Sequence, residues 1–378
     1  MEINYNIKDL FRAPRSALSL TKIVTFLRAN IVGYLVYLIA NYLALYLSGN
    51  AFVNIWQSHG VYPCAYIYEL NWYSSIIFWV SASYWFLCIY GTMCAVSKIT
   101  LQELKGDYFY SIQDAHRFIV KNWHAIVFTP STIFAILVFY AMTTSFFAFL
   151  SKTPLIGSLF LAIPFVIYLF GAIFAVFTLY TFFVSILLTP TIVGTSEEDT
   201  MGTVFNVYML SWRFPLQLII YTIILLPLIY LSQLFLVALI GFGLKIMDLI
   251  FSNSLLMGEK FSAVLGNAAN IIIPKDLFDM TFGSFLTNFY DIFIPRSYQN
   301  LSGIEALSSS LIGIFLLIVV LGCFSYALSV FSSGYVFILN ILKKKSGVDI
   351  ASIKSKDELI ALSSDGTCLL YTSPSPRD

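Results

Sequence analysis

The sequence predicts an all-α fold: a polytopic membrane bundle of about six transmembrane helices with amphipathic interfacial helices, and with both termini inside. Every Asp, Glu, Lys and Arg lies outside six windows of at least 28 residues, while the next longest charge-free stretch has 14. A helix needs about 20 apolar residues to cross the ~30 Å hydrocarbon core, so each window accommodates a span. The windows are residues 29–68, 70–97, 122–151, 153–196, 214–244 and 306–342.

The composition supports the same class. The chain is 59% hydrophobic and 11% charged, whereas soluble domains carry about 25% charged residues. A net charge of +1 provides no basic stripe to neutralise phosphates, which argues against a nucleic-acid partner. The five cysteines show neither disulfide nor zinc spacing, and we expect no metal or cofactor.

The chain divides around these windows. Residues 1–28 form a basic amphipathic cytoplasmic segment that leads directly into the first span without a cleavage site, so this span is expected to act as an uncleaved signal anchor. Residues 29–244 form a membrane domain of five spans, 245–308 an extracytoplasmic insert, 309–342 the sixth span and 343–367 a cytoplasmic tail. Within the insert we expect amphipathic helices at Leu255–Leu265 and Phe278–Ile294. We expect the spans at Asn30–Leu47, Ser74–Val96, Ala125–Leu150, Phe165–Leu188, Leu216–Leu244 and Leu311–Ile338.

The distribution of Lys and Arg sets the expected orientation. With the N-terminus inside, the inner segments hold fifteen of these residues and the outer segments five. Because basic residues are retained on the cytoplasmic side, this bias predicts an N-in, C-in topology.

The fourth window is long enough to raise the question of two spans. A single helix over residues 155–188 would extend about 51 Å, too long for one crossing and too short for two with a turn. Pro154, Gly157 and Pro164 interrupt its first third. We therefore expect a re-entrant or interfacial piece at Pro154–Pro164, followed by one span.

Two inner segments have similar patterns. Apolar and aromatic residues of 111–123 fall on one helical face, and the same pattern recurs 89 residues later within 198–212. With a third amphipathic stretch at Leu10–Ile23, this suggests three repeated units, each a surface helix followed by two spans. The alternative is that amphipathic, capped connectors are common between any two spans.

An acidic cluster opens the second of these segments, at Thr195, Glu197, Glu198 and Asp199. Thr195 and Glu198 have the spacing of a capping box, and carboxylates at a helix N-terminus complement its dipole. The competing interpretation is a functional contact with a cation or a lipid amine at the inner surface.

Other residues within or beside the spans have structural interpretations. Asn41, Gln217 and Gln233 are expected to form interhelical hydrogen bonds. Indole rings favour the headgroup level, and proline frees a backbone carbonyl and bends a helix. We therefore predict an aromatic belt that includes Trp72, Trp123 and Trp212, and span kinks at Pro130, Pro164 and Pro227.

No catalytic motif accompanies these features, and a non-enzymatic protein is expected. The spans contain no Asp, Glu, Lys or Arg, which argues against coupling to protons or ions. The expected function is a membrane scaffold or a protein that interacts with lipids or protein partners, the latter through the 245–308 insert. The alternative is a transporter or permease-like subunit for an uncharged or lipid-like solute.

The stretch TPTIVGTSEEDTMGTVFNVYMLSW, at residues Thr189–Trp212, and the alternation of surface helices with paired spans carry a resemblance. The chain resembles multi-pass inner-membrane proteins of bacterial genome assemblies to which no activity is assigned. The resemblance implies the cytoplasmic membrane of a bacterium and implies no functional residues.

The last eleven residues, Cys368–Asp378, read CLLYTSPSPRD and resemble the translation of a sequencing adapter. We expect them to be an artefact, and they carry no weight in the fold prediction.

Overall fold

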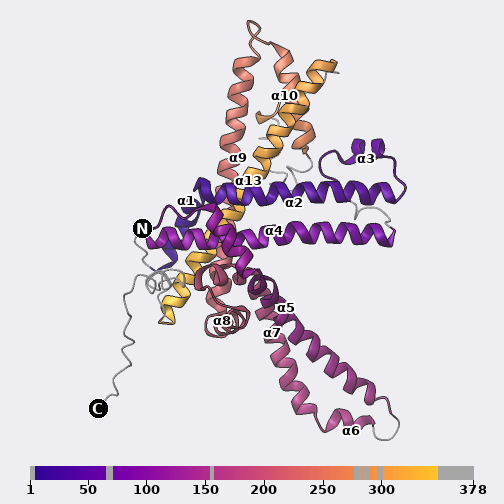
Figure 1. Cartoon of the computed structure of the whole chain (residues 1–378), viewed down its shortest axis with the longest axis vertical. Helices are drawn as coiled ribbons and strands as arrows, with labels where there is room; N and C mark the ends of the chain where they lie inside the picture. The colour runs from indigo at the N-terminus through magenta and orange to yellow at the C-terminus, as the bar shows by residue number, and fades with distance from the viewer. Residues whose placement is uncertain are drawn as a thin grey trace. The chain divides into compact units, whose positions relative to one another are not determined.

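The computed structural model describes residues 5–64, 71–153, 157–275, 283, 290, 292–295 and 301–347. Their regular structure is helical throughout, without strands (Figure 1). Six of these helices are long and apolar enough to cross a membrane, which confirms the predicted fold class and makes this a multi-pass membrane protein. They are α2 (Leu20–Leu47), α4 (Trp72–Lys105), α5 (Ile112–Leu150), α7 (Phe165–Ser196), α9 (Pro215–Phe251) and α13 (Gly303–Lys345).

The observed helices are longer than the predicted spans. They have 28 to 43 residues, and the longest, α13, extends about 64 Å at 1.5 Å per residue. This is about twice the hydrocarbon thickness, so the ends of such a helix project into the headgroups and water. The three lysines that end α13, Lys343–Lys345, lie on such a projecting end.

The chain forms two compact units, which are described separately. Unit 1 comprises Met1–Asp9, Ser97–Ile219 and Tyr335–Asp378, and unit 2 comprises Leu10–Val96 and Ile220–Gly334.

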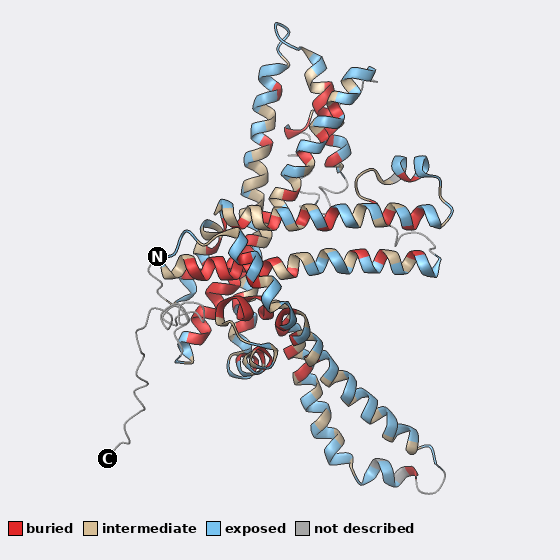
Figure 2. Ribbon diagram, in the orientation of Figure 1, coloured by how far each residue is buried: buried red, intermediate tan, exposed pale blue. Residues whose placement is uncertain are grey.

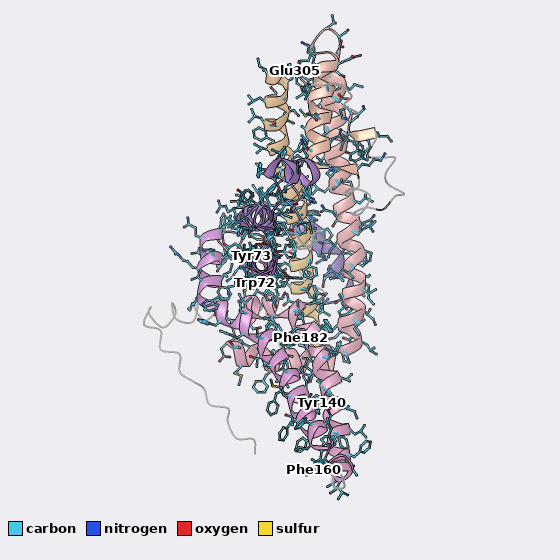
Figure 3. All side chains as sticks on the ribbon, turned by 90° about the vertical axis from the view of Figure 1, so that its right-hand side faces the viewer. Trp72, Tyr73, Tyr140, Phe160, Phe182 and Glu305 are labelled. Carbon is cyan, nitrogen blue, oxygen red and sulfur yellow. The ribbon has the colours of Figure 1, made fainter. Side chains whose placement is uncertain are left out.

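In unit 1, α5 and α7 form a hairpin connected through the short α6 (Gly157–Ala162), and α8 (Thr200–Arg213) packs against both (Figure 1). A Cβ atom added to Gly171 of α7 would lie 2.8 Å from Cε2 of Tyr140, so this glycine permits the close approach of α5. Figure 3 shows Tyr140 and Phe182 on the two arms of the hairpin and Phe160 on α6.

Much of this hairpin is exposed. No described residue of α5 after Ile133 or of α7 before Thr178 is buried, and the exposed side chains there are mostly apolar (Figure 2). Apolar exposure on this scale is expected where lipid tails replace water as the solvent.

Unit 2 is built from the first two spans and from most of α9 and α13. A Cβ atom at Gly33 of α2 would lie 2.2 Å from Cδ1 of Trp85 on α4, and one at Gly334 of α13 would lie 2.4 Å from Leu225 Cδ1 on α9. Asn30 Nδ2 of α2 donates a hydrogen bond of 2.9 Å to Ser325 Oγ of α13. Two glycines therefore allow close packing between α2 and α4 and between α9 and α13, and the buried amide of Asn30 links α2 to α13.

Two of the three predicted amphipathic segments differ from the prediction. Residues 112–123 are the first turns of α5 rather than a separate interfacial helix, because no glycine or proline interrupts them before the span. The 198–212 segment does form a separate helix, α8, whereas 10–23 is divided among η1 (Ile7–Arg12), α1 (Ala13–Ala17) and α2. The three segments therefore do not form equivalent repeated units.

The connections between spans contain two further helices, α3 (Phe52–His59) and α10 (Glu259–Ile272). The amphipathic helix expected at Leu255–Leu265 corresponds to α10, which begins four residues later and ends seven residues later than expected. Most of the helix expected at Phe278–Ile294 lies outside the described residues. The tail from residue 348, including Cys368–Asp378, also lies outside them.

Candidate functional site

A cavity in unit 2 has a volume of about 470 Å³, within the range of roughly 300–1,000 Å³ typical of small-molecule sites. Its lining is almost entirely apolar and comes from the connection between α3 and α4, from α4, α9 and α13, and from the 245–308 insert. The lining residues are Tyr62, Trp85, Gln233, Val237, Ile240, Gly241, Leu244, Ile273, Tyr290, Phe293, Ile294, Val319, Val320, Leu321, Cys323, Phe324 and Ala327.

The cavity lies beside the charge-free parts of three spans. Trp85 of α4, Gln233–Leu244 of α9 and Val319–Ala327 of α13 all belong to windows without Asp, Glu, Lys or Arg. The 245–308 insert supplies four more lining residues, so part of a segment expected to be a partner surface instead contributes to this cavity.

A second cavity of about 290 Å³ adjoins the first in unit 2. Four residues line both cavities: Tyr62, Trp85, Val320 and Leu321. The second cavity also contacts Tyr34 and Tyr37 of α2 and Cys64. The two cavities are therefore neighbours that share these four side chains.

Most polar groups of the lining are engaged within the protein. Trp85 Nε1 donates to Asn30 Oδ1 at 3.3 Å, and the Tyr62 hydroxyl donates to the Ile272 carbonyl at 2.6 Å. The Tyr290 hydroxyl donates to the Ile273 carbonyl at 2.7 Å. Burial raises the pKa of Tyr62 to about 12, which keeps its proton on the phenol near neutral pH.

Gln233 is the exception. Its Oε1 atom is buried and has no hydrogen-bond partner within the described part of the chain. The interhelical hydrogen bond predicted for Gln233 is therefore absent at this oxygen, and an unpaired buried acceptor costs about 1–3 kcal/mol. Asn41 bonds within α2, to the Tyr37 carbonyl, and Gln217 accepts from Lys345 at 3.3 Å.

The predicted acidic cluster lies in unit 1, where each carboxylate has a different partner. Lys98 of α4 forms a buried ion pair with Glu197 and lies 5.1 Å from the ring centroid of Phe118. Glu198 accepts a hydrogen bond from Asn206 Nδ2 and acts electrostatically on Lys343, whose ammonium donates to Ser196 Oγ at 2.5 Å.

The helix cap differs from the predicted capping box. Asp199 is the N-cap of α8 and accepts from the Gly202 amide at 2.9 Å. Thr195 instead lies in the last turn of α7, where its hydroxyl donates to the Thr191 carbonyl at 2.7 Å. The capping-box pairing of Thr195 with Glu198 is therefore wrong, because α7 continues through Ser196.

The predicted prolines occupy two kinds of position. Pro130 and Pro227 lie inside α5 and α9, whereas Pro164 is the N-cap of α7 and precedes its span. Pro164 is therefore not a kink within a helix; it follows α6 at the start of α7.

The three predicted belt tryptophans are all exposed. Trp72 begins α4, where its ring centroid lies 5.8 Å from that of Tyr73 (Figure 3), and Trp123 lies on α5. Trp212 lies on α8, with its ring 5.3 Å from that of Phe177. Their depth in a membrane stays a prediction.

Sequence reasoning did not find the residues that organise the cavity. Asn30 stands at the start of the first charge-free window, next to Arg28, and therefore appeared to be a boundary residue. In the structure it joins α2 to both Trp85 and Ser325. Asn30 and Gly33 are one helical turn apart, so they lie on the same face of a helix. That pairing of a polar residue with a small one could have indicated a close contact with another helix.

A scan against protein-family models found no match, and searches of curated proteins and of solved structures found none either.

Proposed function

We propose that this multi-pass membrane protein binds an uncharged, lipid-like molecule in the unit 2 cavity. The observation that carries the proposal is a 470 Å³ space in the membrane domain, lined almost wholly by apolar side chains. Among the described residues that line the cavity there is no Asp, Glu, Lys, Arg or His, so none of them would compensate a charged ligand.

The position of the cavity supports a ligand that partitions into the bilayer. Because its walls belong largely to charge-free stretches, such a molecule would leave one apolar environment for another. Affinity would then come from packing against aromatic and branched side chains and from shape. Because the chain resembles multi-pass inner-membrane proteins of bacteria, we propose that this membrane is the cytoplasmic membrane of a bacterium.

The test is to fill the cavity. Val237 lines it, whereas Leu239 on the same helix is exposed, so Val237→Trp and Leu239→Trp place the same large side chain in different surroundings. Wild type and Leu239→Trp, purified in mild detergent, should each retain a bound apolar molecule by native mass spectrometry. Val237→Trp should lose it while remaining folded.

Two results would contradict the proposal. One is a wild-type protein that carries no adduct and binds none from added lipid extract; the other is equal retention by both tryptophan variants. Reconstitution into liposomes then separates binding from movement. Transfer of a labelled uncharged lipid between leaflets by wild type, but not by Val237→Trp, would favour the transporter alternative over a lipid-binding scaffold.

A further inference from the structure

We propose that the ligand of the unit 2 cavity carries one uncharged hydrogen-bond donor, of the kind a long-chain alcohol presents, and that Gln233 Oε1 accepts it. The proposal rests on the function proposed above and names the class of ligand. Its basis is the combination of an apolar cavity with a single lining acceptor that the described protein leaves without a partner.

Gln233 Oε1 differs from the other polar groups of the lining in having no hydrogen-bond partner among the described residues. The Tyr62, Tyr290 and Trp85 protons are directed to protein acceptors, at 2.6, 2.7 and 3.3 Å respectively. These three groups therefore hold the walls together. The Gln233 oxygen is the lining oxygen whose hydrogen-bonding capacity is unused among the described residues.

The surroundings also fix the kind of donor. No carboxylate to accompany an ammonium ligand occurs among the lining residues that the structure describes, and water is scarce beside mid-span residues. A neutral hydroxyl is the donor with the lowest desolvation cost that still gives a normal hydrogen bond to an amide oxygen. The apolar remainder of the ligand would fill the space beside Val237, Val320 and Phe324.

A pair of probes that differ in one donor tests the assignment. A long-chain alcohol and its methyl ether have similar apolar volume, but the ether cannot donate a hydrogen bond. Delipidated wild type is titrated with each by native mass spectrometry. It should bind the alcohol about three- to fifteenfold more tightly, the range expected for one hydrogen bond inside a membrane protein.

The matching variant is Gln233→Met, which keeps the length of the side chain but removes the acceptor. It should bind both probes with the affinity that wild type shows for the ether. The control is Gln217→Met, on the same helix and outside the cavity lining, which should preserve the preference for the alcohol. Thermal unfolding of each variant verifies that it is folded.

The outcomes separate the two proposals. If wild type binds neither probe, the proposed function fails and this inference fails with it. If wild type binds alcohol and ether equally, or if Gln233→Met keeps the preference, the donor assignment is overturned while the binding function stands. A preference for the ether would likewise overturn the assignment.

Discussion

Glu197 combines two unusual features at a single residue. Its side chain is only 10% exposed and pairs with Lys98, which is 3% exposed, and its backbone is left-handed with φ +52° and ψ +35°. The conformation ends α7 two residues before Asp199, the N-cap of α8, so one residue both turns the chain and neutralises a buried ammonium.

Removing one partner of this ion pair should be strongly destabilising. Glu197→Gln would leave the Lys98 charge buried without its counter-charge, and we expect the free energy of unfolding to fall by about 3–5 kcal/mol. The double variant Lys98→Met with Glu197→Gln should lose less free energy of unfolding than Glu197→Gln alone, because no buried charge is then left unpaired. Denaturation in detergent micelles measures both.

The exposed pair of Arg117 and Asp114, 3.7 Å apart, serves as the control for that measurement. Arg117→Ala should lower the free energy of unfolding by less than about 1 kcal/mol, because water already solvates both charges. A cost for Glu197→Gln as small as that for Arg117→Ala would show that the buried pair does not stabilise unit 1.

The backbone of Glu197 leads to a second prediction. Both Glu197→Gly and Glu197→Ala remove the carboxylate, but only glycine adopts positive φ without strain, so the glycine variant should be more stable by about 1–2 kcal/mol. At the exposed Met201 of α8 the order should reverse, because alanine favours a helix. Paired thermal melts would reveal the opposite signs, and the same order at both positions would contradict the prediction.

At the scale of helices, small residues set the distances between neighbours. Trp85 packs against Gly33 and is held by Asn30, so Gly33→Ala must separate α2 from α4 or displace an anchored indole. We expect a loss of about 1–3 kcal/mol, as for other overpacked positions. Because Trp85 also lines both cavities, ligand binding should weaken in this variant.

Gly243 on α9 provides the comparison, since an added Cβ there would meet nothing within 4 Å. Gly243→Ala should therefore leave stability unchanged or raise it by about 0.5–1 kcal/mol through helix propensity. Thermal unfolding of both alanine variants tests the pair, and a stable Gly33→Ala protein would refute the close approach of α2 and α4.

The sequence predicts these helices better than it predicts their contacts. Charge-free length alone located all six, because crossing a bilayer imposes a strict minimum on apolar length. The helix ends were missed by up to about 13 residues, as at the start of α5, because amphipathic turns continue a helix without a break. Nothing in a local pattern indicates that Gln233 lines one cavity together with Trp85, Tyr62 and Cys323.

The acidic cluster shows the same limit. Its composition identified a helix boundary and complementary charges, and Asp199 does cap α8. The partners Lys98 and Lys343 come from helices about 100 and 145 residues away in sequence, and only the packing of unit 1 brings them together. Contacts of that separation depend on tertiary structure, which spacing in one sequence does not encode.

At the scale of the whole chain, the inner segments of the predicted topology are divided between the two units. Residues 1–9, the connections before α5 and around α8, and the lysine-rich end of α13 belong to unit 1, whereas residues 10–28 belong to unit 2. The connections after α2 and after α9, predicted to be outside, belong to unit 2, where the Tyr62 hydroxyl donates to the Ile272 carbonyl, but the connection between α5 and α7, also predicted to be outside, belongs to unit 1. The two units therefore do not separate inner from outer segments, and the N-in, C-in topology stays a prediction that rests on the fifteen-to-five charge bias.

Reporter fusions test that topology directly. Truncations fused after Asn206 and Ser346 should give fluorescent, cytoplasmic green fluorescent protein, whereas fusions after Asn50 and Asn253 should give active, exported alkaline phosphatase. The reason is electrostatic: the Lys and Arg residues beside the inner ends of the spans resist translocation, and the outer connections hold few of them. A fluorescent fusion at Asn253 would mean that the number of crossings before it is even, and the six-span topology would then be wrong.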